Sequence, residues 1–179
     1  MNENTKKKLS QIQLIVSDVD GILTDGTISV SKNQEFKTFH VEDALATSLL
    51  RLAGIPISFI SARASAATTA RLDELKIEHY FQGYINKVSA LNKIIDIYKV
   101  DYKDILYIGD GFVDIPVMEK VGFSVSVPNA HLEVKELADF VTIKSGGQGV
   151  LVEIVKHILK SKGIYNSVFE KMRTQVYGV

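Results

Sequence analysis

Short apolar runs recur along the chain, and segments with helical spacing lie between them. The runs are rich in β-branched residues, as buried strands are, and they cover 14–16, 57–60, 105–108, 123–127 and 140–143. Apolar positions at helical spacing occupy 43–53, 65–75, 88–98, 114–121, 132–137 and 150–159. This alternation predicts an α/β fold with a parallel sheet covered by helices on both faces. Ligands of such sheets bind at the C-terminal ends of the strands.

One segment, at about 27–39, breaks this rhythm. Apolar and polar residues alternate there on either side of the turn-like stretch 31–34, which predicts a β-hairpin. We expect the whole chain, 1–179, to form one domain, because its length suffices for a full core. A glycine-rich loop at 146–149 precedes the last helical run, and we expect a C-terminal arm at about 160–179.

The composition narrows the classes of function. The formal net charge is +0, which gives no electrostatic support for binding nucleic acid or an anionic membrane. There is no cysteine, so disulfides, thiolate zinc sites and cysteine nucleophiles are excluded. No stretch approaches the roughly 18 apolar residues of a membrane helix. We therefore expect a cytoplasmic protein with no nucleic-acid or membrane partner.

Two carboxylates follow the first apolar run directly, in Asp18-Val19-Asp20-Gly21. At the end of a strand both would reach the same open edge of the sheet. Asp18 could attack a substrate and bind a metal ion, and Asp20 could give and take a proton. Gly21 allows a sharp turn, and the repulsion between the two carboxylates requires a cation or a shared proton. Taken alone, such a pair is more often a helix N-cap or a solvated turn.

Other predicted strands also end in polar residues suited to phosphate chemistry. Ser61 follows one run, and Asp110 follows another with Asp114 a turn later, while Lys87 precedes a helix. Each has an ordinary structural explanation, since Ser61 and Asp110 could cap helices and Lys87 could be a solvated surface lysine. Their shared position at strand ends favours a single phosphate site.

This ordered set resembles the four motifs of the haloacid-dehalogenase (HAD) phosphohydrolase superfamily, and the resemblance spans 14–149. It implies a Rossmann-like HAD core in which Asp18 forms an aspartyl-phosphate and Asp20 is the general acid and base. It also implies an Mg²⁺ cofactor. The implied metal-binding residues are Asp18, Asp20 through its main-chain carbonyl, Asp110 and Asp114. Ser61 and Lys87 would donate to the phosphoryl oxygens.

The spacing leaves no room for the inserted cap domain of most superfamily members. Only a hairpin and one helix fit between Asp20 and Ser61, and only one helix and one short strand fit between Ser61 and Lys87. A capless member with a long hairpin resembles the 3-deoxy-D-manno-octulosonate 8-phosphate (KDO 8-phosphate) phosphatases. The resemblance implies a phosphoric monoester hydrolase that releases KDO and phosphate for lipopolysaccharide biosynthesis. It also implies a homotetramer whose hairpins pair and whose neighbouring subunits close each other's sites.

Further segments extend this resemblance towards the substrate. The stretch 39–43 matches the segment after the family's hairpin, and Arg63 and Arg71 match arginines that the family uses for its substrate. The resemblance therefore implies a phosphate- and substrate-binding set: Asp20, His40, Asp43, Ser61, Arg63, Arg71 and Lys87.

Several positions depart from the family pattern. A basic residue is usual where this chain has Glu42, Ser48, Gln148 and Val152. Arginine binds a carboxylate through two hydrogen bonds, so the loss of these basic residues leaves the identity of the sugar-acid substrate undecided. Either Arg63 and Arg71 suffice, or the substrate is another sugar phosphate or a sialic-type keto-acid 9-phosphate; Arg63 favours the eight-carbon acid. The alternative from another class is a non-catalytic tetrameric module, which the intact acidic set and Lys87 disfavour.

Overall fold

Six parallel strands form the central sheet of the computed structural model, which describes residues 2–175 and 178. The strand order is β5-β4-β1-β6-β7-β8. The strands are β1 (Leu14–Ser17), β4 (Ile57–Ser61), β5 (Tyr80–Gln82), β6 (Ile105–Ile108), β7 (Phe123–Ser126) and β8 (Phe140–Val141). Ile15 pairs with Ile57 on one side and with Leu106 on the other, so β1 lies in the middle of the sheet. The predicted parallel α/β fold is confirmed.

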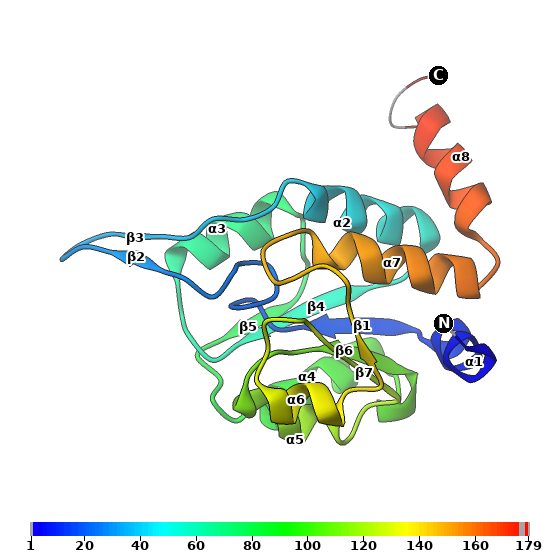
Figure 1. Ribbon diagram of the computed structural model, residues 1–179. Coiled ribbons are helices and arrows are strands. Elements are labelled where there is room, and N and C mark those ends of the chain that lie inside the picture. Colours follow the sequence, from blue (N-terminus) through cyan, green and yellow to red (C-terminus); the bar gives the residue numbers. More distant parts are fainter. Residues whose placement is uncertain (1, 176–177, 179) are drawn as a thin grey trace.

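Helices cover both faces of this sheet (Figure 1). One face carries α2 (Glu42–Ala53), α3 (Ala66–Glu74) and α7 (Val150–Ser161). The other carries α4 (Lys87–Tyr98), α5 (Ile115–Met118) and α6 (Leu132–Leu137). The helix expected at 114–121 is shorter: a 3₁₀ turn (Phe112–Asp114) leads into α5, whose first turn contains Pro116 and which ends at Met118. A further 3₁₀ turn, Tyr102–Asp104, precedes β6.

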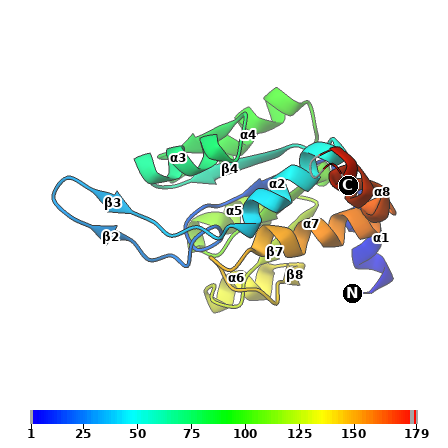
Figure 2. The same cartoon turned by 90° about the horizontal axis from the view of Figure 1, so that it is seen from above.

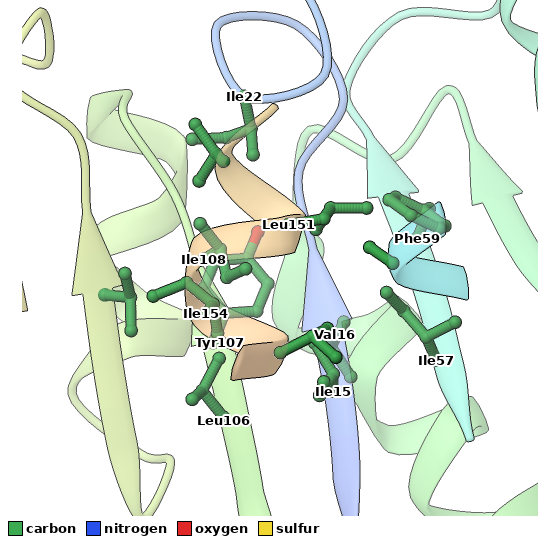
Figure 3. Close-up of a cluster of buried hydrophobic side chains, with 14 of the residues drawn as sticks. Ile15, Val16, Ile22, Ile57, Phe59, Leu106, Tyr107, Ile108, Leu151 and Ile154 are labelled. Carbon is green, nitrogen blue, oxygen red and sulfur yellow. The ribbon is translucent and has the colours of Figure 1, made fainter. Parts of the chain in front are cut away.

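The core lies between these layers. Every residue of β1, β4, β6 and β7 is buried, which explains why these strands read as continuous apolar runs and not as alternating ones. Leu151 and Ile154 bring the apolar face of α7 into the same cluster, which Figure 3 shows together with side chains of β1, β4 and β6. This packing fixes the strand ends in relation to one another.

Two helices lie at the end of the molecule opposite the hairpin (Figure 1). Helix α1 (Glu3–Gln11) begins at Asn2, whose side chain accepts a hydrogen bond from the amide of Thr5 at 2.8 Å. Helix α8 (Tyr165–Gln175) contacts α2 and α7 and buries Val168 and Met172. The segment expected to form an arm thus contains the end of α7 and a packed helix, while 176, 177 and 179 lie outside the described residues.

The hairpin between β1 and α2 extends beyond the sheet (Figures 1 and 2). Its strands, β2 (Ser29–Val30) and β3 (Glu35–Phe36), are antiparallel and shorter than the segment predicted for them. Val30 is 71% exposed and Phe36 is 61% exposed. The hairpin therefore presents apolar side chains that the rest of the described chain does not cover. No helix among the described residues is long and apolar enough to cross a membrane.

Candidate active site

The turn after β1 places the first carboxylate. The amide of Asp18 donates to the carbonyl of Ile108 at 2.9 Å, and the side-chain Oδ1 of Asp18 accepts from the amide of Val19 at 2.6 Å. Gly21 then turns the chain with φ of +89°. A β-carbon at this position would lie 2.0 Å from Oδ2 of Asp110, so only glycine fits between the turn and that carboxylate.

Lys87 joins two of the carboxylates at the first residue of α4. Its Nζ lies 2.8 Å from Oδ2 of Asp18 and 2.7 Å from Oδ1 of Asp114. The same Asp114 oxygen accepts the hydroxyl of Tyr107 at 2.5 Å. The other oxygen of Asp114 accepts the amides of Asp110 at 3.1 Å and Gly111 at 2.9 Å. Asp114 is therefore fully hydrogen-bonded and holds both Lys87 and the loop after β6 in place.

Burial and mutual repulsion shape the electrostatics of this cluster. Burial, followed by the charge of Asp114, raises the pKa of Asp18 to about 8 although Lys87 opposes the shift. The same two causes raise the pKa of Asp110 to about 6. Burial alone would lower the pKa of Lys87, but the charges of Asp18 and Asp114 raise it above its ordinary value. The cluster thus carries more negative charge than one lysine offsets.

The same three carboxylates can hold a metal ion. One oxygen each of Asp18, Asp110 and Asp114 lies within 4.8 Å of the others. Carboxylate oxygens at this spacing suit Mg²⁺, which prefers hard oxygen ligands. A divalent cation would also offset the repulsion that raises the pKa of Asp18. The residues present therefore fit the cofactor that the sequence implied.

Asp20 lies in a different environment from Asp18. Its Oδ2 is 3.4 Å from the hydroxyl of Ser61, and its Oδ1 is 2.6 Å from Nζ of Lys37. Its side chain is 22% exposed, against 8% for Asp18. The structure therefore brings Asp18, Asp20, Ser61, Lys87, Asp110 and Asp114 together at one edge of the sheet. The helix-cap explanation fails for Ser61, because Ser65 caps α3.

Lys37 was missed by the sequence reasoning. It follows β3, and its side chain has no exposed surface. A single lysine beside a hairpin strand is ordinarily a surface residue, so its type and position carried no signal. Only the way the hairpin returns across the loop after β4 reveals the contact with Asp20.

The remaining substrate-binding candidates lie around the base of the hairpin. Arg63 is half exposed, and its Nη2 lies 2.7 Å from Oε2 of Glu35. Arg71 donates to the carbonyl of His40 at 2.9 Å and pairs with Glu74 at 2.9 Å. Both arginines therefore have acceptors within the chain, and Nε of Arg71 has no hydrogen-bond partner among the described residues.

Asp43 lies in the first turn of α2, between this group and α7. It is 1% exposed, and neither carboxylate oxygen has a hydrogen-bond partner of ordinary geometry among the described residues. Burial raises its pKa to about 7, and the charge of Arg71 offsets part of that shift. Asp43 is therefore a buried carboxyl that retains its proton up to about neutral pH, and its part in binding substrate stays a prediction.

The positions that depart from the family pattern do not form one surface. Val152 is 2% exposed and belongs to the core, and the hydroxyl of Ser48 donates to the carbonyl of Ala44 at 2.8 Å within α2. Glu42 instead pairs with Lys144 at 2.7 Å. The lysine supplies a positive charge next to the acidic substitution, so this corner of the site remains electrically balanced.

The glycine-rich loop rests directly on the turn after β1. The amide of Gly147 donates to the carbonyl of Ile22 at 2.9 Å. A β-carbon at Gly146 would lie 1.8 Å from the carbonyl oxygen of Gly21. The loop therefore closes one side of the site through backbone contact, and larger residues cannot replace Gly146 or Gly147 without displacing that turn.

Comparisons with known proteins agree with this arrangement. Residues 80–154 match the haloacid dehalogenase-like hydrolase family. The 3-deoxy-D-manno-octulosonate 8-phosphate phosphatase of Escherichia coli K12 is 35% identical over 157 residues, which are 87% of this chain and 84% of that protein. The Haemophilus influenzae enzyme of the same name is 35% identical over 166 residues, covering 92% of each chain.

Solved structures give the same result. The phosphatase of this name from Yersinia pestis superposes with a TM-score of 0.90 at 30% identity, covering 93% of this chain and 90% of that one. The Moraxella catarrhalis enzyme, solved with a magnesium ion, a phosphate ion and KDO, has a TM-score of 0.90 at 33% identity and covers 95% and 98%. The chain therefore belongs to the haloacid dehalogenase-like hydrolases, within the family of the 3-deoxy-D-manno-octulosonate 8-phosphate phosphatases.

Proposed function

We propose that this chain hydrolyses 3-deoxy-D-manno-octulosonate 8-phosphate to KDO and phosphate through an aspartyl-phosphate on Asp18. One observation carries the chemistry: Nζ of Lys87 lies within 2.8 Å of a carboxylate oxygen of Asp18, after β1, and of Asp114, after β6, while Asp20 lies outside this ion-pair network. Two carboxylates so close in sequence therefore have different surroundings, as a nucleophile and a proton donor require.

In the first step an oxygen of Asp18 attacks phosphorus in line with the leaving sugar oxygen. The bond from phosphorus to that oxygen breaks, and Asp20 gives the oxygen its proton. Ser61 and Lys87 donate to the phosphoryl oxygens, whose charge the transition state spreads. In the second step Asp20 takes a proton from water, which attacks the phosphorus of the aspartyl-phosphate and frees Asp18.

Asp18 must be ionised to attack. Burial and the charge of Asp114 raise its pKa to about 8, so a cation in addition to Lys87 would favour the ionised form. Asp18, Asp110, Asp114 and the main-chain carbonyl of Asp20 would hold Mg²⁺. When bound, Mg²⁺ would offset the charge of these carboxylates and of the phosphoryl group.

The identity of the sugar acid in the substrate is the more specific part of the proposal. Arg63 and Arg71 could receive a carboxylate, because each keeps N–H donors beyond those that contact Glu35, His40 and Glu74. The exposed apolar hairpin favours assembly into a homotetramer in which a neighbour covers the open side of each site. A cytoplasmic location and a role in lipopolysaccharide precursor synthesis belong to the same proposal, and both depend on the sugar-acid substrate.

A substrate panel tests the proposal. Phosphate release is measured for KDO 8-phosphate, a sialic-type 9-phosphate and a neutral sugar phosphate, each with Mg²⁺ and with a chelator. We expect the highest kcat/KM for KDO 8-phosphate and activity only with Mg²⁺. Asp18→Asn should abolish turnover with the fold intact, whereas Asp96→Asn on the exposed face of α4 should not change it. Absence of phosphate release from every sugar-acid phosphate would contradict the proposal.

A further inference from the structure

The hairpin places a buried cation against the proton-transferring carboxylate. Nζ of Lys37 lies 2.6 Å from Oδ1 of Asp20 and 3.1 Å from the hydroxyl of Thr68, and the lysine side chain has no exposed surface. A lysine is rarely buried unless it is paired with an anion, because desolvation of its charge is costly. The Lys37–Asp20 pair therefore links the hairpin to the reacting centre.

Other contacts hold Lys37 in this position. Glu35, two residues earlier, accepts the hydroxyl of Ser65 at 2.6 Å and Nη2 of Arg63 at 2.7 Å. These bonds fix the end of β3 to the loop after β4. Thr68 is itself fully buried in α3. The ammonium group of Lys37 thus rests on anchored neighbours, and a change in the side-chain torsion of Asp20 would break its shortest contact.

Lys37 also determines which oxygen of Asp20 faces the reaction. It occupies Oδ1, so Oδ2 is left towards the hydroxyl of Ser61 at 3.4 Å, which donates to the phosphoryl group in the proposed function. Among the described residues, Lys37 is the only donor within 3.0 Å of the Asp20 carboxylate. Without it, neither oxygen would have a close partner, and the carboxyl could rotate away from the leaving oxygen.

We propose that Lys37 is a positioning residue that holds Oδ2 of Asp20 towards the leaving group in the first step and towards water in the second. The inference rests on the proposed role of Asp20 as acid and base. It assigns the hairpin a part in the chemistry of its own subunit, in addition to any contact with a neighbour. The proposal predicts a defect in both proton transfers and little change in substrate affinity.

The test compares Lys37→Met with Lys37→Arg and with Lys32→Met, a lysine exposed in the hairpin turn. The substrate is a sugar phosphate, whose leaving alkoxide needs a proton. Lys37→Met should lower its kcat by roughly 10- to 100-fold, less than the largest effects of losing a general acid or base. KM should stay within about threefold of the wild-type value. Lys37→Arg should recover part of that loss, since it keeps the cation. Lys32→Met should match the wild type.

A better leaving group separates the two steps. The p-nitrophenolate anion leaves without needing a proton, so aspartyl-phosphate formation from p-nitrophenyl phosphate should stay near the wild-type rate in Lys37→Met. Hydrolysis of the intermediate still needs Asp20, so one equivalent of nitrophenol per site should appear as a burst before turnover slower than that of the wild type. The same variant should show no burst with the sugar phosphate.

Three results would overturn the inference. A raised KM with unchanged kcat would make Lys37 a substrate-binding residue, and equal losses in the first step for both phosphates would make its role only structural. Equal losses in Lys37→Met and Lys32→Met would indicate a general effect on the hairpin. If Lys37→Met does not fold, a folded Lys37→Arg with a lowered kcat and wild-type KM supports positioning, and one with a raised KM and wild-type kcat refutes it. Wild-type turnover of both phosphates, measured first, tests the proposed function separately.

Discussion

Removal of divalent cations should make the stability of this protein fall as the pH rises from 5.5 to 8. Burial and the charge of Asp114 raise the folded-state pKa of Asp18 to about 8, whereas the ordinary value is 3.8. Between these two values the folded chain retains a proton that the unfolded chain has released. The stabilisation is therefore complete below pH 3.8 and is lost as the pH rises through 8.

The size of the pKa shift of Asp18 determines how much stability is lost. Each pKa unit corresponds to about 1.4 kcal/mol. From pH 5.5 to 8, Asp18 alone accounts for a loss of about 3 kcal/mol. Asp110, whose pKa is raised to about 6, shares the repulsion from Asp114, so we add nothing for it. Mg²⁺ binds the ionised ligands and displaces their protons, so its stabilising effect should grow over the same pH range.

Urea unfolding measures this at fixed protein concentration, with Mg²⁺ or with a chelator. The informative quantity is the difference between the two curves at each pH. Asp43, with a pKa of about 7, gives a slope of the same sign that Mg²⁺ should not remove. Asp43→Asn should abolish that common slope and preserve the difference. Asp18→Asn should abolish most of the difference between the curve with Mg²⁺ and the curve with chelator. Asp96→Asn should leave that difference and the common slope unchanged.

Two outcomes would refute this reasoning. A metal-free protein whose stability is constant or rises from pH 5.5 to 8 would show that the carboxylates of the cluster are ionised without a cation. An Mg²⁺ effect that is equal at both ends of the range, with a clear effect at each, would show that the metal binds without displacing protons from Asp18. Either result would leave the charge of the cluster balanced by Lys87 alone.

Two further changes test the site's frame and the exposed hairpin. Gly146→Ala should lower the free energy of unfolding by about 2 kcal/mol or more, because its β-carbon would lie 1.8 Å from the carbonyl oxygen of Gly21. Gly54→Ala, where φ is +68° and no atom lies within 4 Å, should cost only about 1 kcal/mol in the same urea titration. Replacing Val30 and Phe36 by serine should shift the protein to smaller assemblies in light scattering, and an unchanged mass would contradict an interface through the hairpin.

The apolar pattern predicted the parts of the fold that have two covered faces. β1, β4, β6 and β7 are buried on both sides, so their sequences carry continuous apolar runs. Helices α1 and α8 gave no comparable signal. Only Leu9 is buried in α1, and only Val168 and Met172 are buried in α8, so their polar sequences resemble exposed tails. A helix that buries few side chains has a weak apolar pattern in its sequence.

The site was predictable where its residues follow strands. Parallel strands end at one edge, so Asp18, Ser61 and Asp110 had to converge once the sheet was inferred. Lys37 belongs to a hairpin outside the sheet, and strand order says nothing about where a hairpin returns. The pairing of Glu42 with Lys144, 102 residues apart in the chain, is invisible for the same reason. Contacts that depend on loop paths are the ones that sequence periodicity does not encode.

In the proposed mechanism, different surroundings suit the two carboxylates after β1 to different functions. Asp18 is enclosed with Lys87 and two further carboxylates, so it can act as a nucleophile only when enough positive charge is present. Asp20 is more exposed and is held by Lys37, so its orientation depends on the docked hairpin. The metal and the hairpin therefore control different carboxylates. A defect in metal binding should act on the attack by Asp18, and a displaced hairpin should act on proton transfer by Asp20, so rapid kinetics with good and poor leaving groups can separate the two.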